Sequence, residues 1–201
     1  MRTRLTALAA LAAAVVLSAA APRPGEPAPD FTARTAGGET VRLSDFEGQR
    51  VVLEWTNADC PFVRKHYGSG NMQALQRRAD AEGTVWLSVI SSAPGKQGHV
   101  TPDQARALSE DRKAMPAHVL LDESGEVGRA YGAKTTPHMF VIDEAGTVRY
   151  QGAIDTIRSA DQADVARADN YVTAALGALR DDRAVAVTQT QPYGCSVKYE
   201  G

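Results

Sequence analysis

Apolar and polar positions along the chain predict short buried strands that alternate with amphipathic helices. Three β-branched or aromatic runs are typical of strands: Arg50–Thr56, Thr84–Ser91 and Ala117–Asp122. Two more strands, at 137–143 and 147–152, flank Glu144-Ala145-Gly146, which predicts a hairpin.

Helices are expected between these strands. One begins at Pro61, is interrupted by Gly68-Ser69-Gly70, and resumes with apolar residues on one face. Further helices are expected over 101–115, 126–131 and 161–179. This order predicts an α/β fold whose mixed central sheet is parallel where helices cross over and antiparallel at the final hairpin, with helices flanking it.

The first 20 residues are typical of a cleavable signal peptide. Arg2 and Arg4 precede the apolar run Leu5–Leu17, and Ser18-Ala19-Ala20 supplies small residues before the cut. The run is shorter than the roughly 20 residues that span a hydrocarbon core. We therefore expect cleavage near Ala20 and a secreted or periplasmic protein without stable membrane insertion. The alternative is an uncleaved membrane anchor.

The rest of the chain divides into three expected segments. Residues 21–36 contain four prolines between 22 and 29 and predict an extended, proline-rich leader. Residues 37–180 carry the strands and helices and form the expected domain. Residues 181–201 form a polar C-terminal tail that contains Cys195.

Composition and charge exclude several classes of protein. Apolar residues make up 43% of the chain and charged residues 23%, as in an ordinary globular domain. The net charge of -2 provides no basic surplus for a phosphate backbone, so nucleic-acid binding is disfavoured. The chain has two cysteines, too few for a disulfide scaffold or a cysteine-based zinc site, and enough for one disulfide or redox couple.

Cys60 occupies an unusual position for a cysteine. It follows a predicted central strand and precedes Pro61, which marks the first position of a helix. The helix N-terminus and Arg64, one turn further on, favour the thiolate, and Asp59 opposes them. These features predict a reactive thiol, and the alternative is a small buried residue that caps the helix.

Four segments resemble known redoxins. Glu26–Phe31 (EPAPDF) looks like the opening of redoxins of the alkyl hydroperoxide reductase/thiol-specific antioxidant (AhpC/TSA) type, and Val52–Pro61 (VLEWTNADCP) resembles the thioredoxin-fold strand that leads to the active-site cysteine. Thr135-Thr136-Pro137 is similar to the cis-proline loop of that superfamily. Gly194–Tyr199 (GCSVKY) resembles the ending of a peroxiredoxin-like subgroup of secreted or periplasmic redoxins.

The resemblance implies a thioredoxin-like fold and a thiol oxidoreductase. Its substrate would be a thiol, disulfide or peroxide, and an external reductant would recycle it without a cofactor or metal. Cys60 would be the nucleophile, and Cys195 is the candidate resolving thiol. The expected supporting residues are Asn57, Pro61, Arg64, Thr136 and Pro137, with a cis bond before Pro137.

The chain also departs from these families. Val63 stands where thioredoxin has its second cysteine, so the local dithiol is absent. Leu53 and Asn57 stand where peroxiredoxins have a proline and a threonine or serine.

Three alternatives to the enzyme remain open at this point. Cys60, His66 and His138 can be combined into a thiol–imidazole metal site. The chain can be a redox-inactive module that binds an extended peptide beside the proline. Cys60 and Cys195 can also form a permanent structural disulfide.

Overall fold

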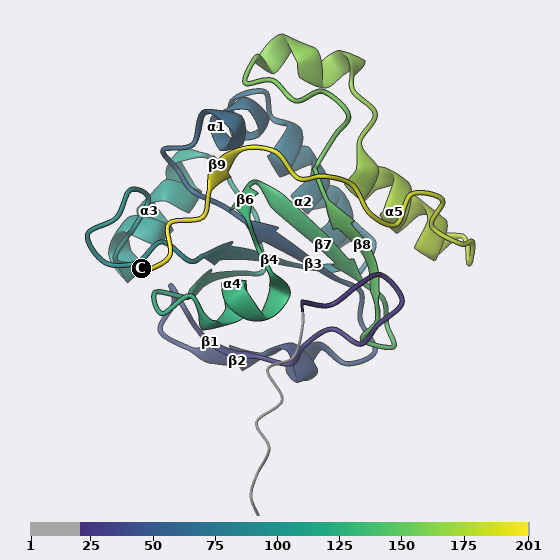
Figure 1. Ribbon diagram of the computed structural model, residues 1–201, viewed down its shortest axis with the longest axis horizontal. Coiled ribbons are helices and arrows are strands. Elements are labelled where there is room, and N and C mark those ends of the chain that lie inside the picture. The colour runs from purple at the N-terminus through teal and green to yellow at the C-terminus, as the bar shows by residue number, and fades with distance from the viewer. Residues whose placement is uncertain (1–20, 201) are drawn as a thin grey trace, which may run out of the picture.

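A seven-stranded mixed sheet forms the centre of the molecule (Figure 1). The computed structural model describes residues 21–200, and the expected signal peptide, residues 1–20, lies outside them. The strands lie in the order β2-β1-β5-β4-β3-β7-β8. Their bounds are Thr32–Thr35 (β1), Thr40–Arg42 (β2), Val51–Trp55 (β3), Val85–Ile90 (β4), His118–Leu121 (β5), His138–Ile142 (β7) and Val148–Gly152 (β8). The parallel neighbours β3, β4 and β5 and the antiparallel hairpin β7–β8 are as predicted. The pairs β1–β2, β1–β5 and β3–β7 are antiparallel as well.

Helices cover both faces of this sheet. Their bounds are Pro61–Gly68 (α1), Asn71–Ala81 (α2), Pro102–Asp111 (α3), Glu126–Tyr131 (α4) and Tyr171–Arg180 (α5). Alternate residues of β3 face opposite cores: Val52 packs with α1, α2 and α5, whereas Leu53 and Trp55 pack on the side of α4. Among residues 21–200, no helix combines the length and the apolar character needed to cross a membrane.

The helix expected over 161–179 is divided in two. A 3₁₀ helix covers Gln162–Arg167, and α5 begins only at Tyr171. Asn170 caps α5, because its side-chain oxygen accepts a hydrogen bond from the Thr173 backbone N–H at 2.9 Å. The prediction of one continuous helix was therefore wrong. The helix expected to reach residue 115 likewise ends at Asp111.

The proline-rich segment is part of the sheet structure. β1 lies within residues 21–36 and pairs with β2 and β5, so the domain begins before residue 37. The backbone N–H groups of Gly25 and Ala28 donate to the Val148 and Gly146 carbonyls at 2.7 and 2.8 Å. Prolines lack this donor, but the residues between them supply it, and the segment lies along the β7–β8 hairpin.

The C-terminal tail is bound across the sheet's end, as the yellow ribbon in Figure 1 shows. Its short strand β9 (Cys195–Ser196) pairs antiparallel with β6 (Thr135–Thr136). Further along, the Lys198 carbonyl accepts a hydrogen bond from the Ala93 N–H at 2.9 Å, and the Tyr199 hydroxyl donates to the Ala133 carbonyl at 2.8 Å. The tail is therefore bound to the domain both at β9 and beyond it.

Candidate active site

Cys60 lies between a central strand and a helix, as expected. β3 ends at Trp55, and α1 begins with Pro61 in its first turn and Cys60 as its N-cap residue. The Asn57 side-chain oxygen accepts a hydrogen bond from the Asp59 N–H at 2.9 Å, and its carbonyl accepts one from the Cys60 N–H at 3.1 Å. Asn57 and Pro61 thus shape the turn that holds Cys60 at the helix N-terminus.

The loop before β7 lies against the Cys60 sulfur. The peptide bond between Thr136 and Pro137 is cis, which confirms the prediction. The Cys60 thiol donates a hydrogen bond to the Thr136 carbonyl, with 3.0 Å between sulfur and oxygen. The Thr136 hydroxyl is buried, and among residues 21–200 it has no oxygen or nitrogen partner. It helps to lower the pKa of Cys60, so Thr136 offers the sulfur both an acceptor and a donor.

The tail brings the second cysteine to the same place. Cys195 is the β-sheet partner of Thr136, and it packs against the apolar cluster that contains Cys60. Gly194 permits this approach: its φ is +139°, and a Cβ atom there would collide with the Thr136 carbonyl oxygen. Both cysteines are free thiols, Cys60 buried and Cys195 half-buried.

The two thiols differ in acidity. Burial by itself would raise the pKa of Cys60, but hydrogen bonds from Cys195, from the Val63 backbone N–H and from Thr136 outweigh it and lower the pKa. Burial and the adjacent Cys60 raise the pKa of Cys195 to about 11. Arg64, expected to act on Cys60, is exposed and instead lowers the pKa of Cys195 slightly. Cys60 is thus the thiol that ionises first.

Val63 and Leu53, which stand where related families have a cysteine and a proline, are core packing residues. Val63 is fully buried in the apolar cluster of α1, α2 and α5, and Leu53 is fully buried in the cluster on the opposite face. Neither position offers a group that can react with Cys60.

The two histidines weighed as metal ligands have other partners. His66 Nδ1 lies 2.9 Å from Asn71 Nδ2, and His138 Nδ1 accepts a hydrogen bond from the Lys134 N–H at 3.3 Å. Burial lowers the pKa of His66 to about 4 and that of His138 to about 3. Within residues 21–200, no group of three or more His, Cys, Asp or Glu side chains is arranged to hold a metal ion.

A buried polar cluster beside Cys60 was not predicted. Lys65, just over one turn after Cys60, forms an ion pair with Asp155, with 3.2 Å between Nζ and Oδ2. The hydroxyl of Tyr193, two residues before Cys195, donates a hydrogen bond to the same carboxylate. Lys and Asp are usually exposed, and these two are 90 residues apart, so no local pattern indicates the cluster.

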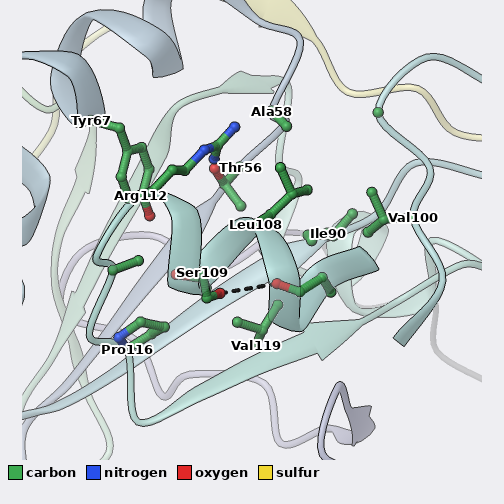
Figure 2. A pocket seen from close by; sticks show the side chains of 14 residues that line it. Thr56, Ala58, Tyr67, Ile90, Val100, Leu108, Ser109, Arg112, Pro116 and Val119 are labelled. Atoms are coloured by element: carbon green, nitrogen blue, oxygen red, sulfur yellow. Dashed lines mark hydrogen bonds between the residues drawn. The ribbon is translucent and has the colours of Figure 1, made fainter. Parts of the chain in front are cut away.

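A small cavity lies beside the loop that follows β3 (Figure 2). Thr56 and Ala58 of that loop line it, together with Tyr67, Leu108 and Arg112. The Arg112 guanidinium lies 4.9 Å from the centre of the Tyr67 ring. The volume of about 30 Å³ accommodates one ordered water and is too small for an organic substrate.

Known proteins share this arrangement of strands and the segment around Cys60. Residues 24–151 match the family model described as the AhpC/TSA family. The chain belongs to the AhpC/TSA family. The matched region contains Cys60 and the cis-proline loop, and Cys195 lies beyond it.

Individual relatives agree with this family assignment. The thioredoxin-like protein YneN of Bacillus subtilis is 27% identical over 126 residues, which cover 62% of this chain and 68% of YneN. The thiol-disulfide oxidoreductase ResA of Halalkalibacterium halodurans is 24% identical over 126 residues, 63% of this chain and 66% of ResA.

Solved structures extend the similarity beyond the matched region. An uncharacterized conserved protein from Geobacillus kaustophilus superposes with a TM-score of 0.74 and 26% identity, covering 88% of this chain and 92% of that one. The structure of a putative thiol:disulfide interchange protein DsbE from Chlorobium tepidum superposes with a TM-score of 0.53 and 28% identity, covering 65% of this chain and 85% of that one. The AhpC/TSA redoxin, the thioredoxin-like fold and the thiol oxidoreductase class are therefore confirmed.

Proposed function

We propose that this protein is an extracytoplasmic thiol oxidoreductase that reduces small hydroperoxides, with Cys60 as nucleophile and Cys195 as resolving thiol. The observation that carries the proposal is the pairing of Cys195 with Thr136, whose carbonyl accepts the hydrogen bond of the Cys60 thiol. Because Val63 replaces a second thiol within α1, an oxidised Cys60 needs a partner from elsewhere in the chain. Cys195 is the other cysteine of the sequence.

In the first step, the Cys60 thiolate attacks one oxygen of the hydroperoxide. A sulfur–oxygen bond forms, the oxygen–oxygen bond breaks, and the departing alkoxide takes a proton to become an alcohol or water. Cys60 is oxidised by two electrons to a sulfenic acid while the peroxide is reduced. The Thr136 hydroxyl beside the Cys60 sulfur is the available donor to the oxygen that the sulfur gains.

In the second step, the Cys195 sulfur attacks the sulfenic sulfur of Cys60. A disulfide forms and the sulfenic oxygen leaves as water. An external dithiol then attacks the more exposed sulfur, that of Cys195, and releases Cys60 as a thiolate. The second thiol of the reductant breaks the resulting mixed disulfide, which frees Cys195 and leaves the reductant as its own disulfide. The lowered pKa of Cys60 favours it as the leaving group, since thiols of lower pKa leave faster.

The burial of Cys60 favours a small oxidant over a folded disulfide protein. The exposed fraction of Cys60 is 0% with the tail in place. A hydroperoxide reaches such a sulfur through small local fluctuations, whereas a protein disulfide requires the tail to leave β6.

The extracytoplasmic setting rests on the pattern of residues 1–20 and on the cysteine pair. A disulfide between Cys60 and Cys195 persists in an oxidising compartment and is reduced in the cytosol. The external reductant is then a dithiol of the same compartment. N-terminal sequencing of the exported protein tests the setting, with Ala21 expected as the first residue.

Reaction of the reduced protein with one equivalent of hydrogen peroxide, followed by intact mass analysis, tests the chemistry. We expect wild type to lose both thiols, and Cys60→Ser to remain reduced. Cys195→Ser, the matched control, accumulates sulfenic acid at Cys60, and a second equivalent of peroxide converts it to sulfinic acid. Dithiothreitol must return oxidised wild type to two free thiols.

Three outcomes contradict the proposal. If wild type loses no thiol, the protein is a redox-inactive binding module. A disulfide that resists dithiothreitol is a structural one. If Cys195→Ser shows no more oxidised Cys60 than wild type, Cys195 is not the resolving thiol.

A further inference from the structure

Tyr193 joins a buried ion pair next to the tail's cysteine. Its hydroxyl donates a hydrogen bond to Asp155 and lies 3.4 Å from both Lys65 Nζ and His66 Nε2. The exposed fractions of Lys65, Asp155 and Tyr193 are 1%, 3% and 4%. We call Lys65, Asp155 and Tyr193 the tyrosine seat.

Within the tyrosine seat, the positive charge of Lys65 is balanced by the negative charge of Asp155. Lys65 and Asp155 carry opposite charges, and burial lowers the pKa of His66 to about 4, so its ring is neutral at neutral pH. Lys65 Nζ also donates to the Ile157 carbonyl at 2.8 Å. A buried ion pair is a weak source of stability, and its best-attested use is to specify one register among several. The tyrosine seat therefore favours the one tail position that carries a hydroxyl. An apolar contact would accept other positions of the tail equally well.

The same tyrosine connects the tail to the helix that carries Cys60. Its ring packs edge-on against Phe62 of the first turn of α1, with 5.7 Å between ring centres. Only Gly194 separates Tyr193 from Cys195, and its backbone lies tightly against Thr136. A displacement of Tyr193 is thus transmitted to Cys195 through a very short piece of chain.

We infer that Tyr193 is a positioning residue whose hydroxyl, held by Asp155 and Lys65, sets the register in which Cys195 meets Cys60. The inference rests on the proposed function and concerns its second step, in which the disulfide forms and water leaves. Tyr193 takes no part in those bond changes. It increases the fraction of time that the Cys195 sulfur spends within reach of the sulfenic acid.

The variant Tyr193→Phe tests this role, because it removes the hydroxyl and keeps the ring against Phe62. Rapid quenching after hydrogen peroxide addition, with intact mass analysis, separates loss of the Cys60 thiol from disulfide formation. We expect the first rate to be unchanged and the second to fall about tenfold, as for loss of one hydrogen bond to a charged group. More Cys60 should then reach sulfinic acid. Asp155→Asn, which weakens the acceptor and also leaves the buried Lys65 without its opposite charge, should slow the same step and lower the stability.

Tyr199→Phe is the matched control, since it removes the hydroxyl of another tail tyrosine, bonded to Ala133. We expect it to form the disulfide at nearly the wild-type rate. A wild-type rate in Tyr193→Phe, or equal slowing in both variants, would overturn the positioning role and leave the proposed function intact. If wild type itself forms no disulfide, both fail. Circular dichroism and the rate of the first step verify that each variant is folded.

Discussion

Glu54 and Asp155 are both buried carboxylates, and their hydrogen bonds and charges are satisfied in different ways. Glu54 of β3 is fully buried and accepts hydrogen bonds from Tyr67, Trp86 and Ser88 at 2.9 to 3.0 Å. Burial raises the pKa of Glu54 despite these bonds, which favours the protonated acid. Asp155, by contrast, is paired with a buried cation, Lys65.

The partners of these two carboxylates distinguish the core of the domain from the part that depends on the tail. Every partner of Glu54 lies between residues 67 and 88, on β4 and the first two helices. Asp155 accepts one hydrogen bond from the nearby Ile157 N–H at 3.1 Å, and its other bonds come from Lys65 of α1 and from Tyr193 of the tail, 128 residues beyond Lys65. Glu54 therefore belongs to the core, and Asp155 reports whether the tail is bound.

The largest expected effect comes from removing the cation. Lys65→Met should destabilise the protein by about 3–5 kcal/mol, because it leaves Asp155 buried without its opposite charge. Glu54→Gln should cost only about 1 kcal/mol, since the acceptor oxygen stays. Denaturant unfolding measures both. Arg64→Met, an exposed neighbour, is the control, and similar losses at Lys65 and Arg64 would contradict the comparison.

A smaller effect is expected when the tail alone is displaced. Gly194→Ala places a methyl group against the Thr136 carbonyl and should cost about 1–3 kcal/mol by overpacking, with faster alkylation of Cys195. Gly177→Ala is the matched control: it lies inside α5 with open space around it, so alanine should stabilise by about 0.5–1 kcal/mol. Thermal unfolding and thiol alkylation measure both changes. Unaltered Cys195 alkylation in Gly194→Ala would show that the tail is not held at this glycine.

The smallest expected effect is a change in the acidity of Cys60. The Cys195 thiol donates a hydrogen bond that lowers the pKa of Cys60. Cys195→Ala removes the donor and should raise that pKa, so the thiolate appears at higher pH. Cys195→Ser keeps a donor and should leave the pKa at or below the wild-type value. Thiolate ultraviolet absorbance against pH gives the midpoint, and equal midpoints for alanine and serine would contradict this role.

The parts of the site that follow from local signals were predictable. Pro61 after a β-branched run indicates the strand–helix junction at Cys60, and residues 144–146 indicate the β7–β8 hairpin. The cis bond before Pro137 followed from the resemblance to the thioredoxin superfamily. Each of these features depends on residues close together in the sequence.

The parts that depend on distant partners were not predictable. β6 and β9 are two residues long, too short for any period of apolar positions. Nothing beside Lys65 indicates that its charge is buried, since its partner Asp155 follows β8. Val165 and Val172 do have helical spacing, but Asn170 favours a helix start between them.

The position of β9 also has a topological consequence. A bond between the two sulfurs would close a ring from residue 60 to residue 195, which contains β4, β5, β7 and β8 and leaves β3 outside. In the sheet, β3 lies between β4 and β7, so two strands of the ring would enclose it on either side. Rings of roughly a hundred residues restrict the unfolded chain by about 4–5 kcal/mol. Oxidation would thus lengthen the lifetime of the whole protein against proteolysis, and the redox state of one sulfur pair would set its turnover.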